Sequence, residues 1–88
     1  MARAPIVGPA ALDAYAIRCA LRAPLSRWMP PTQAEFAGWL GVSVATVRDW
    51  EQGRRRPDAA ARTLLALIAT APAETVALLS KIAEDRTR

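Results

Sequence analysis

The sequence has few of the residues on which protein chemistry most often depends. Histidine is absent, which removes the usual general base and the commonest metal ligand. Cys19 is the only cysteine, so no disulfide can form within the chain. No pairing of a nucleophile with a base, no cluster of metal ligands and no phosphate-binding loop can be found. We therefore expect a protein that is not an enzyme, with no catalytic residue, no cofactor and no metal site.

Long apolar runs are also missing. None reaches the roughly 18 to 20 residues of a membrane-spanning helix. Residues 1–11, interrupted by Pro5, Gly8 and Pro9, do not have the pattern of a signal peptide. We expect no membrane contact and a cytoplasmic location. The 88 residues suffice for one small domain, which we place at 12–83, between a flexible arm at 1–11 and a frayed tail at 84–88.

The composition favours helices and a polyanionic partner. Hydrophobic residues make up 52% of the chain, but many of them are alanine, so we expect a thin core. Domains of this size often gain stability by oligomerising. The net charge is +4, and Lys81 is the only lysine, so the other basic residues are arginine. Such a charge is typical of nucleic-acid binding, although a merely cationic surface would also account for it.

Apolar residues recur at helical spacing, and no alternation typical of strands is found. The pattern predicts an all-α fold of five helices. The first begins at Leu12 or Asp13, and a further helical turn is expected at 24–28 before Pro30 and Pro31. The expected helices cover about 12–22, 32–40, 44–52, a stretch after Asp58 and a stretch from Pro72.

Local signals define the second and third helices sharply. Thr32 and Glu35 have the spacing of a capping box, in which each side chain accepts from the other residue's backbone amide. Gly41 can end the helix with positive φ, Ser43 can cap the next helix, and Gly53 can end it. The sequence therefore predicts two short helices joined by a tight turn at about 33–52.

This layout has the side-chain pattern of a helix-turn-helix, the unit that places one helix in the major groove of DNA. A small residue is needed where the two helices cross, and glycine is needed in the turn. The remaining positions must be apolar to fill the space between the helices. The chain satisfies all of them, with Phe36, Ala37, Leu40, Gly41, Val42, Val47 and Trp50.

The two segments TQAEFAGWLGVS and VATVRDWEQGRRRP resemble the lambda-repressor-like, XRE-type helix-turn-helix regulators, which include phage Cro and repressor domains. The second segment is also similar to HigA-like antitoxins. The resemblance covers about residues 33–67 and implies a five-helix lambda-repressor-like DNA-binding domain. The Ile17 to Leu21 pattern matches the family's first helix but lies eight residues too early. This offset implies an extra or extended segment between the first two helices.

The resemblance implies base contacts from the start of each helix. Gln33 matches the first residue of the family motif, which touches a phosphate or a base edge. Val44, Ala45 and Thr46 match the exposed start of the recognition helix, and their methyl groups suit thymine. Arg48 can contact guanine or a phosphate. Asp49 can accept from a cytosine amine, or can instead pair with a neighbouring arginine.

Phosphate contacts are expected around these positions. Arg54, Arg55 and Arg56 follow the recognition helix, where they can bind phosphates or simply complement the helix dipole. Thr32 and Ser43 lie at helix N-termini and can offer hydroxyl and amide donors.

Two residues of the motif have a structural role in this interpretation. Glu51 matches a buried family glutamate that pairs with an arginine of the first helix, so Arg18, Arg22 or Arg27 is expected to be its partner. Trp39 occupies a position that is usually exposed and polar. It either packs on the extra segment, near Trp28, or is an exposed anchor for a partner protein.

We expect a sequence-specific DNA-binding regulator, a repressor, that acts as a homodimer on a near-palindromic stretch of double-stranded DNA. The expected dimer surface is the last helix, through Val76, Leu78, Leu79 and Ile82, although this helix can instead only close the core. The protein is then either an antitoxin that binds a RelE/HigB-like toxin or a stand-alone repressor. The alternative is a protein-interaction module that keeps the helical fold as a scaffold without specific DNA binding.

Overall fold

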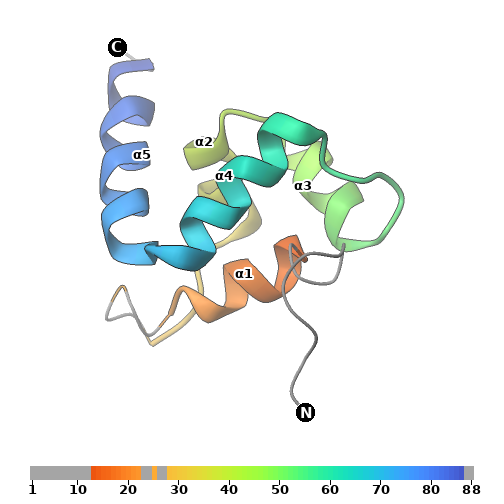
Figure 1. Ribbon diagram of the computed structural model, residues 1–88, viewed down its shortest axis with the longest axis horizontal. Coiled ribbons are helices and arrows are strands. Elements are labelled where there is room, and N and C mark those ends of the chain that lie inside the picture. Colours follow the sequence, from red (N-terminus) through yellow and green to blue (C-terminus); the bar gives the residue numbers. More distant parts are fainter. Residues whose placement is uncertain (1–12, 23–24, 26–27, 87–88) are drawn as a thin grey trace.

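The computed structural model describes residues 13–22, 25 and 28–86. These residues form five helices and contain no strand, so the all-α prediction is confirmed (Figure 1). The predicted arm at 1–11 and most of the predicted helical turn at 24–28 lie outside the described residues. The helices are α1 (Ala14–Ala20), α2 (Gln33–Leu40), α3 (Val44–Glu51), α4 (Ala59–Thr70) and α5 (Pro72–Arg86).

Side-chain caps begin the first four helices, mostly where the sequence predicts them. Thr32 and Glu35 form the complete capping box, with hydrogen bonds of 2.9 and 3.0 Å. Ser43 caps α3 and Asp58 caps α4. Asp13 is the cap of α1 rather than part of its first turn, because its carboxylate accepts from the amides of residues 15 and 16. Each such cap contributes about 1 kcal/mol to helix stability.

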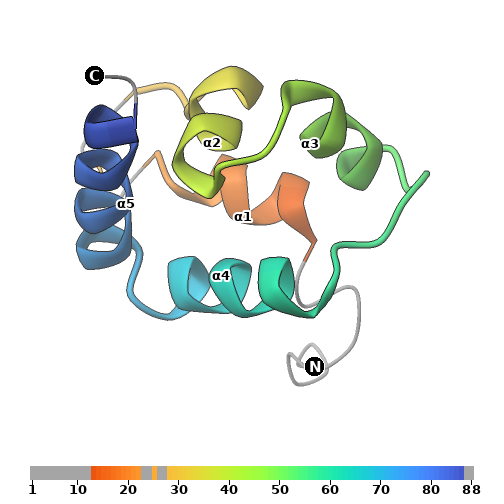
Figure 2. The same cartoon turned by 90° about the horizontal axis from the view of Figure 1, so that it is seen from above.

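The core lies where the helices face one another. In Figure 2, α1 lies between α4 on one side and the pair α2 and α3 on the other. The helix α5 packs at the α2 end of this arrangement, and α3 lies at the opposite end. The largest fully buried apolar side chains lie in α2, α3 and α4 and just after α1, and include Leu21, Phe36, Val47, Leu65 and Ile68. Burial of one such side chain contributes about 1.5–3 kcal/mol. Among the described residues, the core therefore consists mainly of larger apolar side chains, and Ala14 and Ala37 are its only alanines.

The turn between α2 and α3 has the predicted geometry. Gly41 lies in the left-handed region with φ 75°, and its amide donates to the carbonyl of Ala37 at 2.9 Å. The amide of Val42 donates to the same carbonyl at 3.1 Å. The other predicted helix-turn-helix positions are buried (Phe36, Ala37, Leu40, Val47) or half-buried against the core (Val42, Trp50). The residues expected to set the angle between the two helices therefore do face inward.

The last helix differs from expectation in two ways. Val76 and Leu79 were predicted to form the dimer surface, but they are buried in the core because α5 packs on α2 and α4. That part of the prediction is wrong for these two residues, whereas Leu78 and Ile82 are exposed. The helix also continues to Arg86 instead of fraying from residue 84. Arg86 Nη1 donates to the carbonyl of Gly38 at 3.1 Å, which holds the last turn against the end of α2.

The segment between α1 and α2 exposes large apolar side chains. Trp28 is 86% exposed, so it does not form the predicted stack with Trp39. Trp39 itself is half-buried and packs against the hydrophobic core, so it is not a fully exposed anchor. Leu25 also packs against the core. No helix in the described part of the chain combines the length and the apolar character required to span a lipid bilayer.

Candidate nucleic-acid interface

The outer face of α3 holds most of the residues predicted to contact bases. Ala45 and Arg48 are exposed, and Thr46 and Asp49 are half-buried. Val44 is also half-buried, but it packs against the core, so only part of its side chain is free to meet DNA. The structure thus brings these five residues together on one short helix.

Two hydroxyl groups meet at the N-terminus of α3. Ser43 Oγ accepts from the amide of Thr46 at 3.1 Å and lies 2.9 Å from Thr46 Oγ1. One of these hydroxyls therefore donates to the other, and the methyl group of Thr46 is the part best suited to a base edge. Ser43 Oγ accepts the Thr46 amide through a lone pair, so its own hydroxyl hydrogen is available to a phosphate oxygen when Thr46 Oγ1 is the donor between the two hydroxyls.

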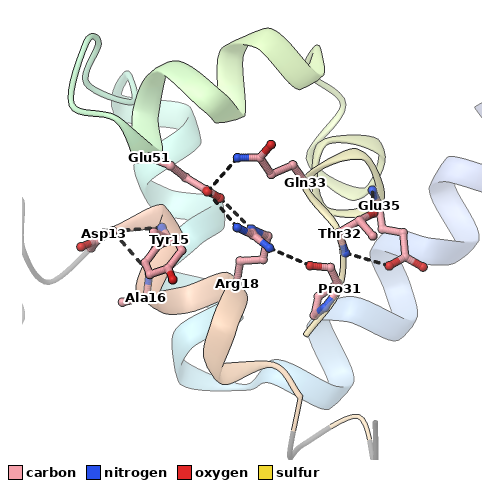
Figure 3. Close-up of polar contacts among 9 residues, drawn as sticks. All are labelled: Asp13, Tyr15, Ala16, Arg18, Pro31, Thr32, Gln33, Glu35 and Glu51. Atoms are coloured by element: carbon pink, nitrogen blue, oxygen red, sulfur yellow. Dashed lines mark hydrogen bonds and ion pairs between the residues drawn. The ribbon is translucent and has the colours of Figure 1, made fainter. Parts of the chain in front are cut away.

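A polar cluster at the other end of α3 joins three helices (Figure 3). Arg18 of α1 donates to Glu51 of α3 through Nε at 2.7 Å and through Nη2 at 2.8 Å. Its Nη1 donates to the carbonyl of Pro31 at 2.9 Å, just before α2. Arg18 is thus the partner of Glu51, one of the three that the sequence left open, and its guanidinium carbon lies 5.6 Å from the ring centroid of Tyr15.

Glu51 is charged in this cluster. Its side chain is only 5% exposed. Burial alone would raise the pKa of Glu51, but the hydrogen bonds from Arg18 and Gln33 outweigh it and bring the pKa below its usual value. The pKa of Arg18 is raised, chiefly by its hydrogen bonds to the carboxylate. Both ends of the pair therefore stay ionised at neutral pH.

Gln33 takes part in the same cluster, which the sequence did not indicate. Its Nε2 donates to Glu51 Oε1 at 2.9 Å, and its side chain is half-buried. A contact between Gln33 and DNA must use the second hydrogen of this amide or its Oε1 oxygen. Thr32, the other predicted contact at this end of α2, has its hydroxyl and its own amide engaged in the capping box.

The three arginines after α3 form an exposed basic segment. Arg54, Arg55 and Arg56 are all exposed. Arg54 Nη1 lies 3.9 Å and Arg55 Nε lies 3.8 Å from the carboxylate of Asp49. The sequence left open whether Asp49 accepts from a base amine or pairs with a neighbouring arginine. In the structure it is paired with two arginines and also lies on the outer face of α3, where a base could reach it.

The described residues form no metal-binding cluster and no disulfide. No group of three or more histidine, cysteine, aspartate or glutamate side chains among them can hold a metal ion. Cys19 is half-buried and unpaired by any disulfide. Comparisons with protein-family models, with curated proteins and with solved structures find no match to this chain.

Proposed function

We propose that this protein is a sequence-specific DNA-binding regulator, a repressor, that inserts α3 into the major groove through a lambda-repressor-like helix-turn-helix. The observation that carries the proposal is the outer face of α3, where small and polar side chains lie next to an exposed run of three arginines. A major groove admits one α-helix, and arginines beside it neutralise phosphates.

The support of α3 suits this task. Arg18 and Glu51 tie its C-terminal end to α1, and the Gly41 turn fixes its N-terminal end relative to α2. Val47, on the inner face of α3, is fully buried in the core. A recognition helix must be held rigidly for its contacts to distinguish bases, since a helix that tilts freely loses the benefit of each hydrogen bond.

In this proposal the residues divide the work. Ala45, Thr46 and the exposed part of Val44 contact thymine methyl groups, and Arg48 contacts guanine or a phosphate. The basic segment 54–56 contacts phosphates on the wall of the groove. Ser43 and Thr32 donate their hydroxyl hydrogens to phosphates while their oxygens still accept from the amides of Thr46 and Glu35.

The proposed homodimer uses the exposed part of α5. Leu78 is 63% exposed and Ile82 is 50% exposed, one turn apart on the same helix. Because α5 and α3 lie at opposite ends of the molecule (Figures 1 and 2), pairing through α5 places one α3 on each side of the dimer. A near-palindromic operator is the matching DNA. An antitoxin and a stand-alone repressor both fit this arrangement, and copurification with a RelE/HigB-like toxin would separate them.

A second candidate is a protein-interaction module without specific DNA binding. The observation that favours it is the set of exposed apolar side chains away from α3, which includes Trp28 and Leu78. Exposed apolar residues that lie close together mark partner surfaces, although single ones are common on any protein.

Selection of bound duplexes from a random pool tests the proposal. The wild type is expected to recover a defined sequence, and Thr46→Ala is expected to recover a different one, because it changes a base contact. Arg56→Ala is expected to weaken binding to all duplexes alike and to reduce the slope of log K against log salt by about 0.9. If the wild type binds no duplex at low salt, the interaction-module candidate is favoured instead.

A further inference from the structure

The carboxylate of Asp49 lies within ion-pair distance of two arginines that we assign to phosphate binding. Its oxygens are 3.9 Å from Arg54 Nη1 and 3.8 Å from Arg55 Nε. The backbone also folds back at this point, because the amides of Arg54 and Arg55 donate to the carbonyl of Asp49 at 2.8 and 3.4 Å. These backbone hydrogen bonds keep the start of the basic segment next to Asp49, so the two arginine side chains begin within reach of its carboxylate.

These ion pairs are weak enough to exchange. The arginine side chains are 70% and 57% exposed, and the distances are near the limit for an ion pair. Such surface pairs add little stability. A phosphate presents charged oxygens to the same guanidinium groups and makes shorter bonds with them. When the phosphate arrives, however, the carboxylate remains close to it and repels it.

The position of Asp49 on α3 determines which bases can offset the repulsion between its carboxylate and a phosphate. Asp49 follows Ala45 by one helical turn, so both lie on the face that would enter the groove. The groups in the major groove that donate to a carboxylate are the amines of cytosine and adenine. Guanine and thymine edges present acceptors at the corresponding positions and would repel it.

We infer that Asp49 is a specificity-determining residue of the proposed DNA-binding site. It holds Arg54 and Arg55 away from phosphates on unrelated duplexes, and it releases them without penalty only where a base amine donates a hydrogen bond to its carboxylate. The inference rests on the proposed function. Its consequence is that the basic segment binds unrelated DNA more weakly than three free arginines would, while binding to the operator is largely preserved.

The test compares Asp49→Asn with Asp85→Asn. Both substitutions raise the net charge by the same amount, but Asp85 is an exposed residue on α5, at the opposite end of the molecule from α3. Affinities are measured for the duplex selected by the wild type and for an unrelated duplex, between about 50 and 200 mM salt. Thermal melting of each variant checks that the fold is intact.

Asp49→Asn is expected to tighten binding to the unrelated duplex about fivefold and to leave binding to the selected duplex within about twofold. The ratio of the two affinities then falls, and the salt slope on the unrelated duplex becomes steeper. Asp85→Asn is expected to change both affinities by less than about twofold. Adding Asp49→Asn to a protein with Arg54→Ala and Arg55→Ala is expected to tighten binding by less than about twofold, because the arginines that the carboxylate holds are then absent.

Equal effects of Asp49→Asn and Asp85→Asn would overturn this inference alone, because net charge would then be the cause. Equal weakening on both duplexes would also overturn it, since Asp49 would then support binding in general. A wild type that binds no duplex would overturn the proposed function together with this inference, so the two failures can be told apart.

Discussion

Arg18 and Glu51 are 33 positions apart in the chain and meet through two hydrogen bonds of 2.7 and 2.8 Å. The arginine belongs to α1, and the glutamate is the last residue of α3. Gln33, the first residue of α2, adds a third donor at 2.9 Å. One carboxylate therefore holds the first three helices together, and the orientation of α3 depends on it.

Removing the arginine should destabilise the fold strongly. Arg18→Ala leaves the carboxylate of Glu51 buried without its main partner, which typically costs about 3 kcal/mol. Chemical denaturation measures the free energy of unfolding. Arg22→Ala is the control, because Arg22 is exposed just beyond the same helix and its loss should change stability by less than about 0.5 kcal/mol. Similar losses for both variants would show that the cluster matters little.

The stability of the protein should fall in acid partly through Glu51. Its pKa is lower in the folded state than the usual value of about 4.3, so the stabilising effect is complete above that pH. It is lost as the pH falls through the folded-state pKa. Urea denaturation between pH 7 and pH 3 should therefore show a smaller decline for Glu51→Gln than for the wild type. Parallel curves would contradict this account.

Two glycines, one within α2 and one in the turn to α3, should respond to alanine in opposite ways. Gly41 has φ 75°, and a Cβ there would lie 3.3 Å from the Arg86 guanidinium, so Gly41→Ala should cost about 1–2 kcal/mol. Gly38 lies within α2 with nothing within 4 Å of an added Cβ. Gly38→Ala should stabilise the fold by about 0.5–1 kcal/mol. Thermal melting of both variants gives the comparison, and a change of the same sign would refute it.

Neighbouring leucines of α5 should have separate roles. Leu79 is buried, so Leu79→Ala should cost about 2–4 kcal/mol of unfolding free energy. Leu78 is exposed, so Leu78→Lys should leave the stability of the monomer nearly unchanged but weaken the proposed dimer. Sedimentation equilibrium over a range of concentrations measures the second effect. A wild type that stays monomeric throughout would remove α5 as the dimer surface.

The features that the sequence predicts well are local. The capping box of Thr32 and Glu35 needs only residues three apart, and Gly41 needs only its own freedom to adopt positive φ. The assignment of Val76 to a surface failed for a different reason. Helical spacing groups the apolar residues of α5, but which of them face inward depends on where α2 and α4 lie.

The polar contacts of the candidate site were harder to predict. The pairing of Glu51 with an arginine of the first helix was expected from family resemblance, which left three candidates for the arginine. Nothing local indicated that Gln33 would join them, because its position at the start of α2 also suits a contact with DNA. The contact between Arg86 and Gly38 spans 48 positions and had no signal in the sequence.

That last contact affects how the protein can be shortened. A chain ended at residue 83 would keep every buried apolar side chain, since the last of them is Leu79. It would nevertheless lose the guanidinium that covers the final turn of α2, next to the glycine from which the chain enters α3. Removing the last residues of α5 would therefore weaken the support of the turn between α2 and the proposed recognition helix α3.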